Sequence, residues 1–178
     1  NLVRKKYFLL RKKKYYEIDK NFFIPFLNLI KSNFKKNFKL ALYYPSSFEV
    51  NTLKLLEISY VSKQQLSLPV IGENNTMNFF LWKKNEVLKV NKYGMLEPIK
   101  TMQNIPNVIL VPLLAFDNNK YRLGYGKGYY DRYLNKYLKK FKNILTVGVA
   151  FSFQKHHKLP TNNKDVKLDY ILTEKGIH

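Results

Sequence analysis

The sequence predicts an α/β fold with a mostly parallel central sheet flanked by helices, the three-layer arrangement of Rossmann-like proteins. Short apolar segments alternate with helical ones, which is typical of such sheets. A β-branched run at residues 108–111 ends at Pro112 and has the composition of a buried central strand. The 178 residues contain no repeat and no linker, so we expect residues 1–178 to form one domain.

Four segments have helical patterns. Residues 3–16 place Val3, Tyr7 and Leu10 at helical spacing and predict a basic helix. Residues 22–34 predict a second helix, which Pro25 should break early. The other two are a helix capped by Ser46 or Ser47 that runs through Leu53, Leu56 and Tyr60, and a helix from Tyr129 to about Lys142.

Six segments have the composition of strands. Residues 38–44 form an apolar run that Pro45 stops, and residues 144–151 form another. The shorter candidates are residues 65–71, 77–82, 108–111 and 169–172. Because strands and helices alternate along most of the chain, we expect the strands to pair mainly in parallel.

The chain is strongly basic. It has 32 Lys and Arg residues against 12 Asp and Glu residues, which gives a formal net charge of +20. Such a charge attracts anions, including nucleotides and nucleic acid. Lys and Asn are nevertheless abundant throughout the sequence, so a general compositional bias is the simpler explanation of the charge.

Several kinds of protein are excluded by what the sequence lacks. It has no cysteine, which excludes disulfides, thiol catalysis and cysteine zinc sites. No apolar run approaches the about 20 residues that a membrane span requires. The basic start has no apolar segment and no cleavage site of a signal peptide. We therefore expect a cytoplasmic protein with no membrane partner.

A glycine-rich loop lies between the expected central strand and the next helix. Residues 111–131 read VPLLAFDNNKYRLGYGKGYYD, and this position in α/β sheets commonly binds ligands. Gly124, Gly126 and Gly128 allow backbone conformations in which amide groups converge on an anion. The helix that follows adds the positive end of its dipole. The spacing matches neither the Walker A loop nor the Rossmann fingerprint.

Charged side chains surround this loop. Arg122 and Lys127 add positive charge, and Asp131 offers a carboxylate that could hold a Mg²⁺ ion bridging phosphate oxygens. A plain turn is the alternative interpretation of a glycine cluster. The density of Arg, Lys, Tyr and Asp residues favours a phosphate site instead.

Residues 111–132, VPLLAFDNNKYRLGYGKGYYDR, resemble the signature VPGLAFDxxGxRLGxGxGYYDR of the 5-formyltetrahydrofolate cyclo-ligase family. Leu113 and Lys120 stand where that family usually has glycine. The resemblance covers nearly the whole chain, because further landmarks follow in the family's order. They are Arg4 and Arg11 near the start, residues 45–52 (PSSFEVNT), Glu97-Pro98, and residues 165–169 (DVKLD).

The resemblance implies an enzyme that uses ATP and Mg²⁺ to convert 5-formyltetrahydrofolate into 5,10-methenyltetrahydrofolate, with release of ADP and phosphate. In this family ATP phosphorylates the formyl oxygen, N10 attacks the activated carbon, and phosphate leaves. The implied partner is a small-molecule folate, with or without a polyglutamate tail. We expect a monomer that binds no nucleic acid.

The resemblance also implies a role for each matching residue. Arg122, Lys127 and Tyr129 are the expected catalytic residues, and Asp131 and Asp165 are the expected Mg²⁺ ligands. The expected ATP contacts are Arg4, Arg122, Leu123, Gly124, Tyr125, Gly126, Lys127, Gly128, Tyr129 and Tyr130. The expected folate contacts are Tyr44, Glu49, Tyr125, Gly126, Lys127, Gly128 and Tyr129, with Glu49 accepting paired hydrogen bonds from the pterin.

Structural roles remain open for several of these residues. Arg4 fits a solvated helix face, and Glu49 fits the first turn of a helix, where the dipole favours an acid. Asp165 fits a loop acid, and Tyr44 fits the core. Two other functions also remain open: a basic, aromatic module that binds single-stranded nucleic acid, and another α/β enzyme that handles sugar phosphates or coenzyme A. Neither explains the set of motifs.

Overall fold

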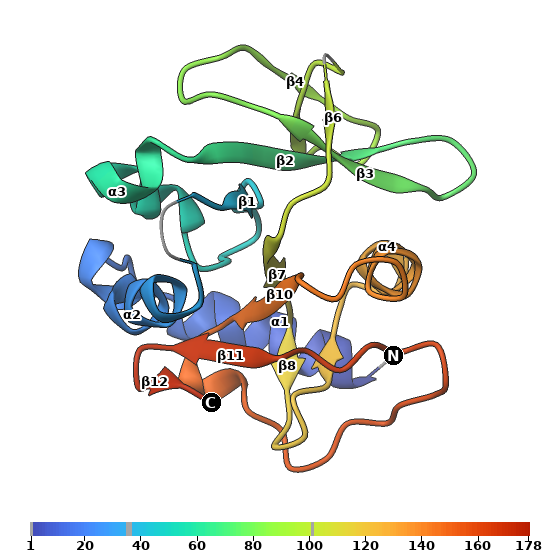
Figure 1. Ribbon diagram of the computed structural model, residues 1–178. Coiled ribbons are helices and arrows are strands. Elements are labelled where there is room, and N and C mark those ends of the chain that lie inside the picture. Colours follow the sequence, from blue (N-terminus) through green and yellow to red (C-terminus); the bar gives the residue numbers. More distant parts are fainter. Residues whose placement is uncertain (1, 35–36, 101) are drawn as a thin grey trace.

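The computed structural model describes residues 2–34, 37–100 and 102–178. Within these residues, eight strands form one sheet in the order β12-β11-β10-β7-β1-β2-β3-β6 (Figure 1). Strands β4 and β5 pair in a separate hairpin, as do β8 and β9. No helix in this part of the chain is long and apolar enough to cross a membrane.

The helices and strands have the following bounds. The helices are α1 (Leu2–Lys14), α2 (Ile24–Asn33), α3 (Ser59–Ser62) and α4 (Tyr129–Tyr137), with the short 3-10 helices η1 (Lys20–Phe23), η2 (Thr52–Glu57) and η3 (Ser152–Gln154). The strands are β1 (Lys39–Ala41), β2 (Gln65–Ile71), β3 (Met77–Leu81), β4 (Leu88–Val90), β5 (Leu96–Pro98), β6 (Gln103–Asn104), β7 (Val108–Pro112), β8 (Ala115–Phe116), β9 (Arg122–Leu123), β10 (Leu145–Val149), β11 (Tyr170–Thr173) and β12 (Gly176–Ile177).

The five neighbouring strands β11, β10, β7, β1 and β2 all pair in parallel, while β12, β3 and β6 add antiparallel edges. The prediction of a mostly parallel sheet with β7 near its centre is therefore confirmed. From β1 the chain moves to β2 on one side, whereas β7 lies on the other side of β1 and leads to β10 and β11. The strand order thus reverses between β1 and β7, and ligands in α/β sheets bind outside the carboxyl ends of the strands at such a point.

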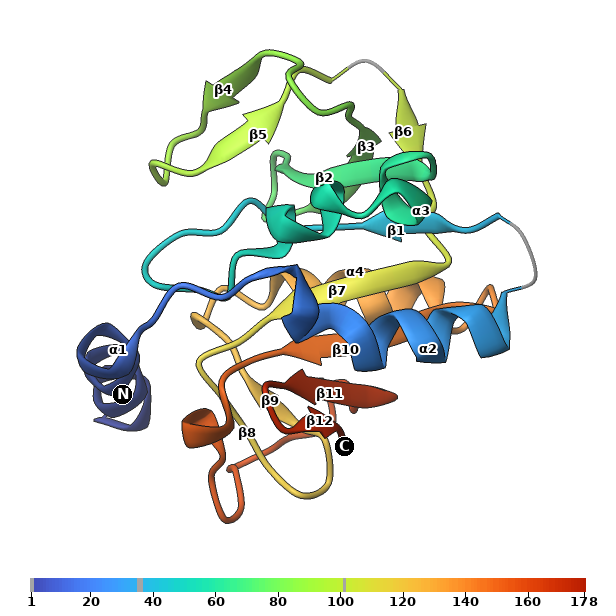
Figure 2. The ribbon, with the colours of Figure 1, turned by 90° about the vertical axis from the view of Figure 1, so that its left-hand side faces the viewer.

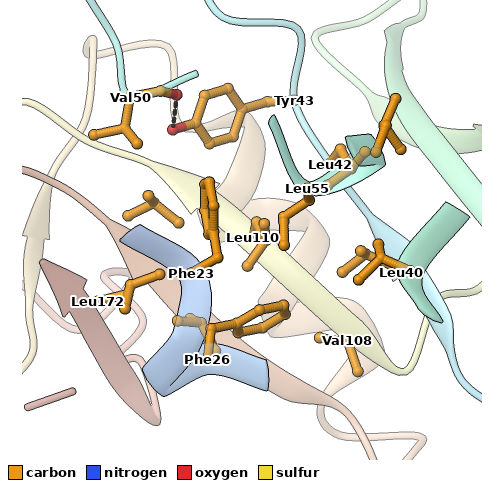
Figure 3. Close-up of a cluster of buried hydrophobic side chains, with 14 of the residues drawn as sticks. Phe23, Phe26, Leu40, Leu42, Tyr43, Val50, Leu55, Val108, Leu110 and Leu172 are labelled. Carbon is orange, nitrogen blue, oxygen red and sulfur yellow. Dashed lines mark hydrogen bonds between the residues drawn. The ribbon is translucent and has the colours of Figure 1, made fainter. Parts of the chain in front are cut away.

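Helices cover both faces of this sheet. Figure 2 shows α2 in front of β7 and β10 and α4 behind them, while α1 lies beyond the carboxyl ends of β1 and β7. Alternate residues of β7 face the two sides: Val108 and Leu110 pack with Phe26 of α2 in one core cluster (Figure 3), and Ile109 and Val111 pack in the other, with side chains of α4. Each large apolar side chain fully buried in this way contributes about 1.5–3 kcal/mol to folding.

Leu113 occupies a position where the family signature has glycine. Its side chain is 1% exposed and lies against Gly148 of β10, where an added Cβ atom would come within 2.8 Å of the Leu113 Cδ2 atom. Gly148 leaves the space that Leu113 fills, so the larger residue is accommodated inside the core.

The predicted helix start at Ser46 or Ser47 is wrong, although Leu53, Leu56 and Tyr60, through which that helix was predicted to run, do lie in the short helices η2 and α3. Ser47 and Phe48 have φ angles of 49° and 65°, in the left-handed region, so residues 46–49 form a turn instead. The helix η2 begins only at Thr52, where the side chain of Asn51 accepts a hydrogen bond from the backbone N–H of Leu53. The capping residue is therefore an asparagine four residues after Ser47.

Other predicted elements differ in length. Helix α1 ends at Lys14 and α4 at Tyr137, so both are shorter than predicted. Strand β1 covers three residues of the predicted seven. The short strands β4, β5, β6, β8, β9 and β12 lie outside the predicted elements. In the turn of the β8–β9 hairpin, Lys120 has a φ of 64°, which explains why glycine is usual at this position.

Candidate active site

The glycine-rich loop connects β9 to α4 at the carboxyl edge of the parallel sheet. Gly126 and Gly128 have φ angles of 95° and 66°, which few residues other than glycine adopt easily. Within the described part of the chain, the backbone N–H groups of residues 125–128 make no hydrogen bond. The loop thus offers free donors, and α4 begins directly after it, so the arrangement suits an anion.

Arg4 of α1 lies against this loop. Its Nε atom donates to the carbonyl oxygen of Gly124 at 2.9 Å. A Cβ atom on Gly126 would come within 3.3 Å of the Arg4 Cζ atom, so the guanidinium occupies space that only glycine leaves free. Arg4 is therefore held at the loop, and the solvated-face alternative is wrong.

Arg122 and Asp131 form an ion pair across the loop. The Arg122 Nη2 atom lies 2.9 Å from the Asp131 Oδ1 atom, and the Arg122 side chain is only 4% exposed. Val166 joins both residues, because its carbonyl oxygen accepts from Arg122 at 3.2 Å and its N–H donates to Asp131 at 3.1 Å. The ion pair thereby ties the loop and α4 to the segment that follows Asp165.

Asp165 directly precedes Val166 in the sequence, but its carboxylate accepts a hydrogen bond within its own turn. The Asp165 Oδ2 atom accepts from the backbone N–H of Asn162 at 2.7 Å. Within the described residues, no three His, Cys, Asp or Glu side chains group together as metal ligands do. Two carboxylates are hard donors of the kind that Mg²⁺ takes together with phosphates and waters. The donor chemistry of Asp131 and Asp165 therefore fits that ion.

Glu49 is buried where the 46–49 turn meets the glycine loop, and it is 7% exposed. Its Oε1 atom accepts from the hydroxyl of Tyr125 at 2.5 Å, and its Oε2 atom accepts from the N–H of Ser46 at 2.9 Å. Burial raises the pKa of Glu49, although the positive charge of Arg11 and these hydrogen bonds lower it in part. Glu49 precedes η2 rather than lying in its first turn.

Tyr125 therefore links the glycine loop to the Glu49 carboxylate. Tyr125 as a whole residue is 45% exposed on the loop, while its hydroxyl lies between Glu49 and Arg11. Burial of the hydroxyl raises the pKa of Tyr125, and the charge of Glu49 raises it further. The hydroxyl consequently stays protonated and acts as a donor to the carboxylate.

Arg11 is a member of this cluster that the predicted site did not include. Its Nη2 atom donates to the Tyr125 hydroxyl at 2.6 Å and to the Ser47 carbonyl at 2.8 Å, and its Nη1 atom donates to the Leu113 carbonyl at 3.1 Å. In the sequence it is one basic residue among many in α1. Its match to the second arginine of the family was the signal that could have found it.

Two further tyrosines place their hydroxyls near Glu49. Tyr43 donates to the carbonyl oxygen of Val50 at 2.9 Å, whereas the buried hydroxyl of Tyr130 has no partner within the described residues. Burial, and then the charge of Glu49, raise the pKa of both tyrosines. Tyr44, the predicted folate contact, lies half-buried against the same core cluster that contains Tyr43, and the sequence analysis did not single out Tyr43 or its contact with Val50.

The exposed rim of the loop carries Lys127 and Tyr129. The Tyr129 hydroxyl lies 2.8 Å from the hydroxyl of Tyr93, in the turn of the β4–β5 hairpin. The Lys127 ammonium lies 5.9 Å from the centre of the Tyr93 ring. Tyr93 was also missed, because nothing in the sequence places that hairpin against the loop. The contact adds aromatic faces that suit a flat heterocycle.

Two surface pockets are lined by other residues. One of about 520 Å³ is lined by Lys120, Leu145, Lys167, Leu168, Asp169 and Tyr170. Another, of about 590 Å³, lies beside Trp82 and Lys83. Neither contains a residue of the predicted site, so the site is defined by the glycine loop and its charged partners.

Comparison with known proteins decides the family. Residues 26–174 match the sequence model of the 5-formyltetrahydrofolate cyclo-ligase family. The chain belongs to this family. A 5-formyltetrahydrofolate cyclo-ligase of Haemophilus influenzae is 33% identical over 153 residues, which cover 82% of this chain and 80% of that protein. A probable 5-formyltetrahydrofolate cyclo-ligase of Schizosaccharomyces pombe is 32% identical over 157 residues, with 80% and 76% covered.

Solved structures support the cyclo-ligase fold. The NMR structure of the Aquifex aeolicus 5,10-methenyltetrahydrofolate synthetase has a TM-score of 0.75 and 36% identity, covering 98% of this chain and 89% of that one. The 5,10-methenyltetrahydrofolate synthetase from Mycoplasma pneumoniae has a TM-score of 0.68 and 26% identity, covering 97% and 96%. The expected family and fold class are thus both confirmed.

Proposed function

We propose that this cyclo-ligase converts 5-formyltetrahydrofolate into 5,10-methenyltetrahydrofolate with ATP, releasing ADP and phosphate, and that residues 1–178 act as one domain. The observation that carries this proposal is the position of Tyr125. It lies on a loop with free amide donors and basic neighbours, and its hydroxyl binds the buried carboxylate of Glu49. One residue therefore joins a site suited to phosphate with a site suited to a pterin.

The nucleotide half consists of the loop and its cations. Arg4, Arg122 and Lys127 lie on or against residues 122–130, where their charge can neutralise a triphosphate. ATP supplies the phosphoryl group that activates the formyl oxygen, so that N10 can attack the activated carbon and phosphate can leave. Phosphoryl transfer depends mainly on such positioning and neutralisation. We therefore assign Arg122 and Lys127 as catalytic residues, and the family motif adds Tyr129.

Asp131 and Asp165 are the residues that would hold Mg²⁺. The contacts of Asp131 with Arg122 and with Val166 both use its Oδ1 atom. One carboxylate oxygen is thus available to a metal ion while the ion pair stays formed. Bound there, Mg²⁺ would neutralise phosphate charge during the transfer.

The folate half is centred on Glu49. An ionised carboxylate can accept two parallel N–H groups from the 2-amino-4-oxo ring of a pterin. The rings of Tyr44, Tyr125 and Tyr129, together with the backbone of residues 126–128, would line the rest of the pocket. Binding at Glu49 and at the loop together would bring the formyl oxygen next to the terminal phosphate.

The proposal also covers the location, the oligomeric state and the partners of the enzyme. We expect a cytoplasmic monomer whose partner is the small-molecule folate, with no nucleic acid and no membrane partner. The +20 charge also fits a nucleic-acid-binding module. Family membership favours the cyclo-ligase.

An absorbance assay tests the function. The full chain with ATP, Mg²⁺ and 5-formyltetrahydrofolate should produce the strongly near-UV-absorbing methenyl product, and omission of ATP should abolish the signal. Folded protein that gives no absorbance increase would contradict the proposal. If that protein instead bound RNA tightly and with steep salt dependence, the nucleic-acid alternative would replace it.

A further inference from the structure

Arg11 is a buried cation at the point where three segments meet. Its side chain is 1% exposed, and its terminal nitrogens donate to the carbonyl oxygens of Leu113 and Ser47 and to the hydroxyl of Tyr125. The Nε atom is buried and has no hydrogen-bond partner among the residues that the structure describes, so these terminal contacts hold the guanidinium. One side chain of α1 thus links the end of β7, the 46–49 turn and the glycine loop.

The 46–49 turn has an unfavourable backbone conformation. Ser47 and Phe48 both have positive φ angles, which non-glycine residues adopt rarely and only where the surrounding structure holds them. Arg11 binds the carbonyl of Ser47, and the carboxylate of Glu49 binds the N–H of Ser46. Contacts to both sides of the turn therefore fix the backbone from which Glu49 projects.

We propose that Arg11 is a positioning residue that fixes the orientation and the ionised state of Glu49 for folate binding. This inference rests on the proposed function, in which Glu49 binds the folate. Arg11 acts through the turn and through the hydroxyl of Tyr125, and it is assigned no contact with the folate itself. Its guanidinium remains charged at any pH at which the enzyme works.

The groups that face Glu49 come from every element around it. Arg11 comes from α1, Tyr43 from the segment after β1, Tyr125 from the loop and Tyr130 from α4, while Ser46 is in the same turn. The three tyrosines are neutral, because their pKa values are raised. Burial raises the pKa of Glu49 and the charge of Arg11 opposes that rise. Without Arg11, more of Glu49 should be protonated at neutral pH.

The test compares Arg11→Met and Arg11→Gln, which remove the charge, with Arg11→Lys, which keeps it. We expect both neutral variants to raise the KM for 5-formyltetrahydrofolate at neutral pH by about tenfold or more. A nearby opposite charge commonly changes the ionisation constant of a carboxylate by that factor. The KM for ATP should change much less. As the pH is lowered, kcat/KM for the folate should begin to fall at a higher pH in the neutral variants than in the unchanged enzyme. In Arg11→Lys this fall should return to its original pH.

A measurement without ligands separates positioning from general damage. Carboxyl-¹³C-labelled glutamate, with the Glu49 signal assigned by its loss in Glu49→Gln, reports the ionisation of Glu49 directly. In Arg11→Met or Arg11→Gln this signal should titrate at higher pH than in the unchanged protein. Lys12→Met removes an exposed charge from the same helix and should leave both the titration and the folate KM unchanged.

The outcomes distinguish the two proposals. If Glu49→Gln binds folate normally, the assignment of Glu49 fails and the role of Arg11 fails with it. If Glu49→Gln is impaired but a folded neutral variant of Arg11 keeps the original titration and folate KM, only the inference about Arg11 is overturned. Since two neutral variants are compared, loss of folding in one leaves the other to decide.

Discussion

At the scale of single residues, the buried carboxylate of Glu49 couples folate binding to pH. Burial raises its pKa, so protonation begins at a higher pH than for an exposed glutamate. A protonated acid cannot accept two N–H groups, and kcat/KM for the folate should therefore fall as the pH is lowered. Profiles of kcat/KM against pH should show this fall at low pH for the folate. An equal fall of kcat/KM for folate and for ATP would contradict the role of Glu49.

Glu49→Gln should weaken folate binding more than ATP binding and should remove the fall of kcat/KM at low pH. The raised pKa means that ionising Glu49 disfavours the folded state, so its contribution to stability falls as pH rises through the folded-state value. The variant should accordingly keep its free energy of unfolding at neutral pH within about 1 kcal/mol. Titration of both ligands and urea unfolding check the result, and equal losses for both ligands would contradict the assignment.

Asp131→Asn tests the proposed metal ligand. The change removes the charge that pairs with the nearly buried Arg122, so the free energy of unfolding should fall by about 1–3 kcal/mol, between the values for exposed and for buried pairs. At saturating substrates kcat should fall at least about tenfold, and half-maximal activity should need more Mg²⁺, because a carboxylate ligand is lost. Activity measured across a Mg²⁺ titration gives the answer.

Asp169→Asn is the matched control for Asp131→Asn. Asp169 accepts hydrogen bonds from the N–H and the hydroxyl of Thr146 at 2.8 and 2.7 Å, and it lies outside the proposed metal site. Its replacement should lower stability without changing the Mg²⁺ dependence. If Asp131→Asn and Asp169→Asn gave the same Mg²⁺ curve as the unchanged enzyme, Asp131 would not be a metal ligand.

At the scale of elements, the conformation of the glycine loop explains its composition. Gly126→Ala places a methyl group at a φ of 95° and within 3.3 Å of the Arg4 guanidinium. Gly176→Ala has a comparable backbone penalty at a φ of 115°, with open space around it in the edge strand β12. Both should lose about 1–2 kcal/mol of stability. Only Gly126→Ala should also raise the KM for ATP, and equal KM values would show that Arg4 does not act with the loop.

The β8–β9 hairpin offers a stabilising change. Lys120 adopts a φ of 64°, and Lys120→Gly should raise the free energy of unfolding by up to about 1 kcal/mol because glycine adopts this conformation without strain. Lys120→Ala removes the same contact of the ammonium with the Tyr170 ring but keeps the strain. Chemical denaturation should therefore give Lys120→Gly a higher free energy of unfolding than Lys120→Ala. A lower value for Lys120→Gly would contradict the role of backbone strain.

The sequence predicted those elements whose own residues determine them. Strand β7 has a continuous apolar run, and helix α1 has a clear 3.6-residue period, so both were found. The 46–49 turn was predicted as a helix start because serines before an apolar period are typical caps. Its left-handed residues are held by Arg11, a contact between distant parts of the chain that no local pattern reports. Two-residue strands such as β6 are too short to show a period.

At the scale of the whole molecule, the same distinction applies to the site. The loop motif predicted that Arg122 and Asp131 would lie together, and the structure joins them at 2.9 Å. Arg11 comes from α1 and Tyr93 from the turn of the β4–β5 hairpin, and both reach the loop region through contacts between segments far apart in the sequence. Within a run of basic residues, the sequence alone cannot distinguish a buried arginine from an exposed one.

The net charge of +20 should make stability depend on salt for the molecule as a whole. The described residues contain three ion pairs, so screening weakens few attractions and many repulsions. Raising NaCl from about 0.01 M to about 0.1 M shortens the screening length from about 30 Å to about 10 Å. Urea, which is uncharged, should then unfold the protein at a higher midpoint. A midpoint that falls with salt would mean that attractive surface pairs outweigh the repulsion among the lysines.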